Sequence, residues 1–111
     1  MRAAGIRITG GDIEVLDLPA PRKPAADEVL LRVRAAGVGV WEDYVRSGGW
    51  DIGRRPAMAL GVEAAGAVVT VGGRVAHLKP GDWVLTYPLQ LRDQGAWAEL
   101  LLAPAPPGRW C

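Results

Sequence analysis

The sequence predicts a mainly β domain, a barrel or sandwich of short strands with one embedded helix. Short apolar segments are separated by turns that contain glycine or proline, which is typical of closely spaced strands. Residues 28–35 alternate with a period of two, as a half-buried strand does, and residues 39–47 change to a helical period.

The N-terminal segments predict a hairpin. Residues 2–8 include small and apolar residues and end at Thr9-Gly10-Gly11-Asp12, a hairpin-type turn, after which residues 13–18 resume the sheet. Three prolines then predict an extended connection, because proline donates no ladder hydrogen bond and fixes its own φ; they are Pro19, Pro21 and Pro24.

The clearest strand is 28–35. Its charged residues, at 28, 32 and 34, are predicted on one face, and the other face carries Val29, Leu31, Val33 and Ala35.

A short helix is predicted over 39–47. Val40, Trp41, Tyr44 and Val45 recur at helical spacing, and the opposite side carries Glu42, Asp43 and Arg46. Gly48-Gly49 is the expected stop signal. A helix of this length has to be held by packing, since its propensity alone is insufficient.

Strands are predicted again in the second half of the chain. Residues 64–71 form a strand that turns at Gly72-Gly73. The turn Lys79-Pro80-Gly81-Asp82 leads into a strand over 83–87. A polar loop over 89–95, a last strand over 96–103 and an irregular end at 105–108 complete the prediction.

Composition limits the classes of function. A chain of 111 residues is one domain, and its net charge of +1, without a clustered basic segment, argues against nucleic acid as the main partner. The stretch 57–73 is interrupted by Glu63 and by glycines, so no membrane span is expected. With no signal peptide and a single cysteine, Cys111, we expect a cytoplasmic location.

Few residues could carry nucleophilic or metal chemistry. Ser47 and His77 are the only serine and histidine, and Ser47 does not lie in a nucleophile-elbow pattern. A transition-metal site needs more nitrogen and sulfur ligands than the chain offers.

Glu63 is a single carboxylate within the apolar stretch 59–69. Such a charge must find a partner, stay solvated or raise its pKa. We interpret Glu63 as a structural carboxylate, with a role in a site as the alternative.

Three segments, in one order, carry a resemblance to a known family. The first, 24–48, contains A-A-G-V at 35–38 and Y-V-R-S-G at 44–48; the second, 60–72, contains G-V-E-A-A-G; the third, 78–99, contains L-K-P-G-D and G-A-W-A-E. The set resembles the N-terminal, GroES-like domain of the medium-chain dehydrogenase/reductase superfamily. The resemblance implies a GroES-like, partly open β-barrel over residues 1–108, with 109–111 as a tail.

Within that superfamily the chain resembles the zinc-independent, NADPH-dependent quinone oxidoreductase branch. The zinc-dependent alcohol dehydrogenases place a Cys and a His at the positions of Gly39 and Val62, and neither of these residues can ligate a metal. No zinc is therefore expected. The asparagine that often stands at position 39 in the quinone reductases is also absent.

The resemblance implies hydride transfer from NADPH to a quinone or enone, with the nicotinamide supplying the chemistry. It places Tyr44 near the nicotinamide, with a buried tyrosine that makes one hydrogen bond as the alternative. Trp41, Trp50 and Tyr87 are candidate walls of the substrate pocket, because flat side chains can stack on a ring, with core packing as the alternative for the tryptophans.

The family's Rossmann domain is absent from this chain, so the expected partner is that domain or a chain that carries it, with a homo-oligomer as a further possibility. Two hypotheses follow. The chain is either the substrate-side domain of an NADPH-dependent reductase, inactive alone, or a non-catalytic GroES-like module for binding or oligomerisation.

Overall fold

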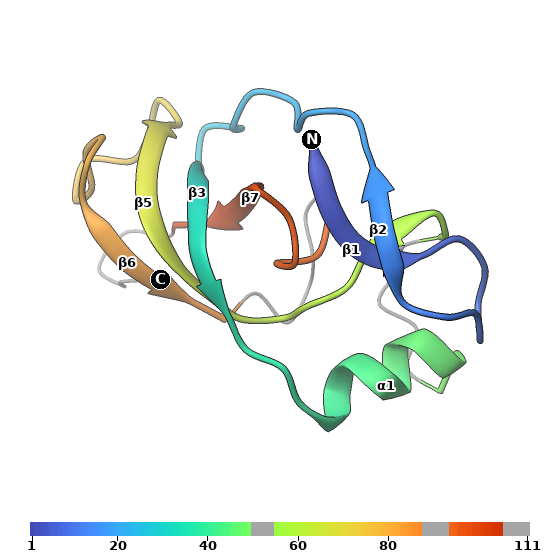
Figure 1. Cartoon of the computed structure of the whole chain (residues 1–111). Coiled ribbons are helices and arrows are strands. Elements are labelled where there is room, and N and C mark those ends of the chain that lie inside the picture. Colours follow the sequence, from blue (N-terminus) through green and yellow to red (C-terminus); the bar gives the residue numbers. More distant parts are fainter. Residues whose placement is uncertain (50–54, 88–93, 106–111) are drawn as a thin grey trace.

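The computed structural model describes residues 1–49, 55–87 and 94–105, and in these residues two antiparallel sheets lie side by side above one short helix (Figure 1). In chain order the elements are β1 (Arg2–Ile6), β2 (Glu14–Asp17), β3 (Glu28–Ala36), α1 (Val40–Ser47), β4 (Met58–Ala59), β5 (Ala64–Val71), β6 (Trp83–Thr86) and β7 (Leu100–Pro104).

The smaller sheet has the order β2-β1-β4 and the larger has the order β6-β5-β3-β7. A bridge between Ala3 and Ala98 joins β1 to the segment that precedes β7. The two sheets do not close into one continuous barrel in the described residues. The prediction of a mainly β, partly open fold with one short helix is confirmed.

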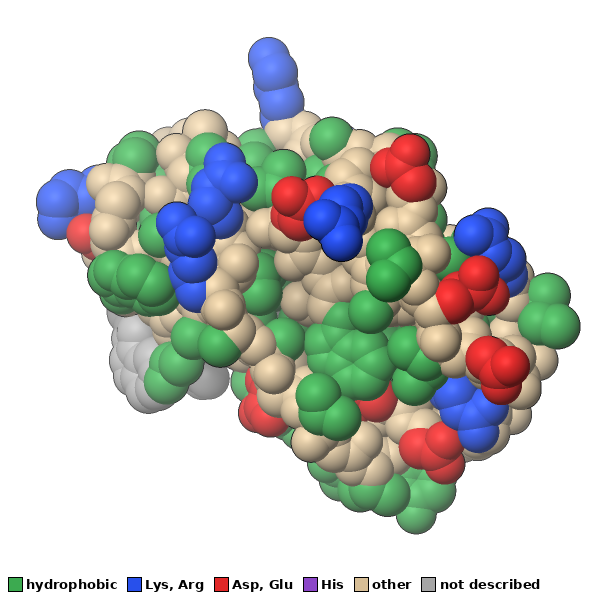
Figure 2. Space-filling view, viewed as in Figure 1, with side chains coloured by type: hydrophobic (Ala, Val, Ile, Leu, Met, Phe, Trp, Pro, Cys, Tyr) green, Lys and Arg blue, Asp and Glu red, His purple; other side chains and the backbone are tan. Residues whose placement is uncertain are grey.

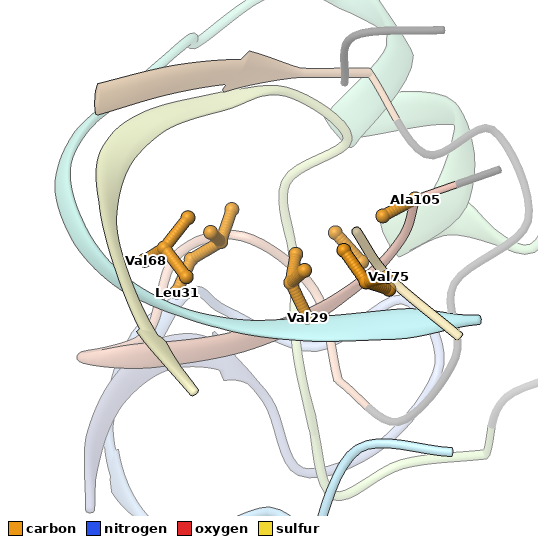
Figure 3. Packing of buried hydrophobic residues seen from close by; sticks show 6 residues of the cluster. Val29, Leu31, Val68, Val75 and Ala105 are labelled. Carbon is orange, nitrogen blue, oxygen red and sulfur yellow. The ribbon is translucent and has the colours of Figure 1, made fainter. Parts of the chain in front are cut away.

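β3 is one of the two inner strands of the larger sheet, and its buried face carries the main core. Val29 and Leu31 are fully buried, which is worth about 1.5–3 kcal/mol for each side chain. They pack with residues from β5, β7 and the connecting segments (Figure 3): Val68, Val75, Ala103 and Ala105. The period-two pattern therefore identified the buried face correctly at these positions.

The predicted charged face of this strand is wrong at Glu28. Its side chain is buried, because the carboxylate accepts two hydrogen bonds from Arg22, at 2.7 and 3.2 Å, and one from the Ala25 N–H at 2.9 Å. The alternation also fails at Ala35, which is exposed. A register shift between Val33 and Ala35 changes the faces of the last residues of the strand.

The last strand begins later than predicted. Residues 96–103 were expected to be one strand, but β7 starts at Leu100. The Trp97 N–H instead donates to the Leu60 carbonyl, and the Trp97 carbonyl accepts from the Ala4 N–H. Trp97 thus bonds to the smaller sheet and to the residue after β4, while Glu99 still accepts a bond from the Val33 N–H of β3. β4, with two residues, was not predicted.

Part of the predicted loop at 89–95 and of the irregular end at 105–108 lies outside the described residues, as do Trp50 and Cys111. In the described part of the chain, no helix is long and apolar enough to span a membrane.

Candidate functional site around helix α1

Helix α1 carries two of the predicted site residues, Trp41 and Tyr44, but its buried side is not the predicted one. Glu42 and Val45 are buried, while Val40, Trp41 and Tyr44 are about half exposed. Glu42 turns inward because its carboxylate accepts a hydrogen bond of 2.9 Å from the Gly39 N–H at the helix start. A carboxylate there also interacts favourably with the positive end of the helix dipole.

The predicted stop of the helix is confirmed. Gly48 has a φ of 87°, the left-handed conformation that glycine adopts without a steric penalty. Its N–H donates to the Val45 carbonyl, and the Gly49 N–H donates to the Tyr44 carbonyl at 2.9 Å. These bonds satisfy carbonyl groups that the end of a helix otherwise leaves without a partner.

We use the name aromatic face for the four exposed hydrophobic side chains before and on α1: Val38, Val40, Trp41 and Tyr44. Their exposed fractions are 81, 59, 50 and 48%, respectively. The rings of Trp41 and Tyr44 lie 6.0 Å apart between centroids, at an interplanar angle of 56°. Figure 2 shows hydrophobic side chains gathered between β3 and α1. Because these side chains are large and exposed, a flat apolar molecule could pack on them.

The loop between β3 and α1 is held from two sides at Gly37. The indole N–H of Trp97 donates to the Gly37 carbonyl at 2.9 Å, and the Gly37 N–H donates to the Glu63 carbonyl at 3.3 Å. A Cβ at position 37 would overlap the Glu63 side chain, so that exposed side chain would have to move to accommodate it. The role of Trp97 was not predicted, and no local sequence pattern indicates a contact across 60 residues.

Glu63 lies at the end of the larger sheet that leads into α1. The register pairs Ala36 with Ala64 and Ala64 with Thr86, so Gly37, Glu63 and Tyr87 follow at neighbouring positions of three adjacent strands. Glu63 is exposed and has no side-chain hydrogen bond or ion pair within the described residues. Of the three outcomes open to this carboxylate, solvation is the one observed. Its structural role stays a prediction.

Tyr87 is 49% exposed at the same end of the sheet, as a site residue would be. An open groove of about 430 Å³ lies beside the loop that leads to α1. Trp41, Tyr44 and Tyr87 do not line it; its lining residues are Ala4, Val33–Ala36, Val38 and Ala96–Ala98. The roles of Trp41 and Tyr87 as pocket walls therefore remain predictions, and Trp50 lies outside the described residues.

The donor set around α1 does not suit zinc. Gly39 caps the helix with its backbone, and Val62 is a buried apolar side chain, so neither position offers a ligand atom. Among the described residues, no three His, Cys, Asp or Glu side chains are grouped closely enough to hold a metal ion. The Ser47 hydroxyl donates to the Tyr44 carbonyl at 3.2 Å, and His77 is exposed.

Comparisons with known proteins agree with this fold. The alcohol dehydrogenase GroES-like domain family matches residues 25–106. Human sorbitol dehydrogenase is 40% identical over 95 residues, which cover 81% of this chain and 26% of that protein. Mouse quinone oxidoreductase is 37% identical over 108 residues, which cover 93% of this chain and 31% of that protein.

A solved structure of a quinone oxidoreductase has the same fold over most of this chain. The quinone oxidoreductase of Escherichia coli, crystallised with NADPH, superimposes with a TM-score of 0.68 at 28% identity, over 92% of this chain and 30% of that one. The chain thus spans less than a third of the length of these relatives. Because the family match covers most of the sequence and the fold agrees with it, the chain belongs to the alcohol dehydrogenase GroES-like domain family of the medium-chain dehydrogenase/reductase superfamily.

Proposed function

We propose that this chain is the substrate-side domain of a zinc-independent, NADPH-dependent reductase of quinones or enones. The observation that carries the proposal is the aromatic face, with Trp41 and Tyr44 exposed on a helix whose start offers no metal ligand at Gly39. A zinc alcohol dehydrogenase needs a metal to polarise its substrate. A quinone is already electron-poor, so a hydride donor and an apolar surface that orients the ring are sufficient.

The proposed roles follow from exposure and chemistry. Tyr44 presents a phenol that can donate a hydrogen bond, and its ring packs against Trp41, so together they offer an apolar surface beside a polar group. NADPH, held mainly by a nucleotide-binding domain, supplies the hydride. Tyr44 lies on the nicotinamide side in this proposal, and Trp41, Trp50 and Tyr87 form walls of the substrate pocket.

The proposed partner is that nucleotide-binding domain, on the same or another polypeptide, and the proposed location is the cytoplasm. Similarity to the quinone oxidoreductases of mouse and Escherichia coli supports the reaction type. Similarity to sorbitol dehydrogenase is of equal strength in sequence, so the absence of side-chain ligands at Gly39 and Val62 is what favours the quinone branch.

The test is oxidation of NADPH by 1,4-naphthoquinone, followed at 340 nm, with the chain supplied together with a nucleotide-binding domain. Tyr44→Phe is expected to lower kcat/KM about tenfold, the loss of one hydrogen bond to a reacting group. Tyr87→Phe, at a proposed wall of the pocket, tests the hydroxyl of the other tyrosine of the chain in the same way. Activity that depends on added zinc, or oxidation of an alcohol in preference to reduction of the quinone, would contradict the proposal.

The chain alone is expected to bind NADPH only weakly. Titration followed by tryptophan emission tests this, and a dissociation constant in the micromolar range would refute the need for a second domain.

A second candidate is a non-catalytic module for binding or oligomerisation. Strand β6 is an edge of the larger sheet, and it exposes Trp83 by 68% and Leu85 by 58%. Exposed apolar edge strands favour association with another chain. Sedimentation of the wild type and of Trp83→Ser/Leu85→Lys distinguishes the two candidate functions. A dimer that the double substitution dissociates, with no reductase activity when the nucleotide-binding domain is supplied, would favour this alternative.

A further inference from the structure

The helix that carries the aromatic face is attached to the β1–β2 turn through one side chain, Arg46. Its Nη1 donates to the Gly10 and Gly11 carbonyls, at 3.1 and 3.2 Å. On its other edge, Nε and Nη2 both contact Oδ1 of Asp43, at 3.0 and 2.9 Å. The guanidinium thus pairs with one carboxylate of its own helix and donates hydrogen bonds to two carbonyls of the turn.

The backbone makes a reciprocal contact at the same place. The Gly10 N–H donates to the Arg46 carbonyl at 2.7 Å, so the turn satisfies one of the last carbonyls of the helix. Gly10 has a φ of 80°, and a Cβ added at Gly48 would lie 3.0 Å from the Thr9 side chain. The turn therefore fits closely over the C-terminal end of α1.

These contacts matter because they join a short helix to the turn of the smaller sheet. It has eight residues, fewer than an isolated helix needs for stability in water, and only Glu42 and Val45 are buried. Val45 packs with Ile6, Met58 and Leu60 and fixes the distance of the helix from the smaller sheet. This packing alone leaves rotation of the helix about Val45 open, and the bonds of Arg46 to the β1–β2 turn oppose that rotation.

We infer that Arg46 is a positioning residue for the proposed site: it sets the orientation of α1, and through it the placement of Tyr44 and Trp41. The inference rests on the proposed function for its catalytic consequence. A lysine could not replace Arg46, because one ammonium cannot bond to Asp43 and to both carbonyls with the fixed fork of a guanidinium. A displacement of about 1 Å at a reacting centre can cost on the order of a hundredfold in rate.

The experiment compares Arg46→Gln, Arg46→Lys and Asp43→Asn with Arg7→Gln. Arg7 is the matched control, because it lies in the same hairpin and pairs with Glu14 at 2.8 Å without contacting α1. All variants are assayed with naphthoquinone and NADPH, together with the nucleotide-binding domain, well below their melting temperatures. Two-dimensional NMR of the same proteins follows the Tyr44 ring and the Trp41 indole.

Arg46→Gln is expected to lower kcat/KM about tenfold or more and to shift the Tyr44 and Trp41 resonances, with Arg46→Lys intermediate and Arg7→Gln unchanged. A residue with a purely structural role would lower the melting temperature and leave kcat/KM and both resonances unchanged in the folded protein. That result would overturn the inference. If Arg46→Gln does not fold, Asp43→Asn, at an exposed position, provides the same comparison.

The two proposals can fail separately. If the wild type does not reduce quinones, the proposed function fails, and the NMR shifts alone decide whether Arg46 positions the aromatic face. If the wild type is active and Arg46→Gln changes neither kcat/KM nor the resonances, the inference about Arg46 fails and the proposed function stands.

Discussion

Replacement of Glu28 by alanine should destabilise the fold more than any other single loss of a carboxylate described above. The side chain is 2% exposed, and it binds both Arg22 nitrogens and the Ala25 N–H. Breaking a buried ion pair by removing one partner costs about 3–5 kcal/mol. Arg22 is half exposed and can regain water, which places the expected cost near the lower end, at about 3 kcal/mol.

Urea unfolding measures this cost. With a slope of about 2 kcal/mol per molar urea, the midpoint should fall by about 1.5 M in Glu28→Ala. Glu28→Gln retains an acceptor for the Ala25 N–H, so it should lose about 1–2 kcal/mol. Glu14→Ala is the control: it removes an ion pair that is exposed on both sides, and it should cost less than about 0.5 kcal/mol. Equal midpoints for Glu28→Ala and Glu14→Ala would refute the reasoning from burial.

Three further predictions concern single side chains. Glu42→Ala should destabilise the protein by about 1–2 kcal/mol, because the Gly39 N–H loses its acceptor and a buried side chain is removed. The same urea assay measures this loss. A smaller effect of Glu42→Ala than of Asp43→Ala would contradict the prediction. The hydrogen bonds that Lys79 donates from its side chain and backbone lower the pKa of Asp82 below 3.8, so this carboxylate stabilises the fold above that pH and the contribution disappears as the pH falls through the lowered pKa. In thermal melts from pH 6 to pH 2, the melting temperature of Asp82→Asn should fall less steeply with acid than that of the wild type. Parallel curves of melting temperature against pH would refute this prediction. Gly95→Ala should lower the free energy of unfolding by more than about 2 kcal/mol, since its Cβ would overlap the Leu60 carbonyl. Gly73→Ala is the control, because a Cβ at position 73 meets open space and should not cost this stability.

Alternation and turn chemistry predicted the larger sheet and the position of the helix well. Val29, Leu31 and Val68 are apolar at alternate positions of strands, and Gly48 ends the helix as its sequence indicates. These features depend on residues that are close in the sequence, so a local sequence pattern can predict them.

The buried carboxylates were assigned to the wrong side because polarity alone suggests solvent. Glu28 and Glu42 are buried because each accepts a backbone N–H three residues before it. For Glu42, the glutamate three positions after Gly39 is half of a capping box and could have indicated this. The register shift at Val33 and Ala35 and the contact between Trp97 and Gly37 depend on partners far along the chain, so no local pattern predicts them.

The contact between Trp97 and Gly37 has a consequence for biosynthesis. Strand β1 is made first, yet the N–H groups of Ala4 and Glu99 bond it to a segment that is synthesised more than ninety residues later. A ribosome adds about 5–20 residues per second, so several seconds pass between the synthesis of β1 and of the loop before α1 and the synthesis of the segment around Trp97 that bonds to them. During that interval the segment that carries Val38, Trp41 and Tyr44 lacks the bond between Trp97 and Gly37, and its eight-residue helix is not stable by itself. Transiently exposed apolar side chains favour misassociation, so the surface proposed here for function is also one at which the nascent chain can misassociate before Trp97 is made.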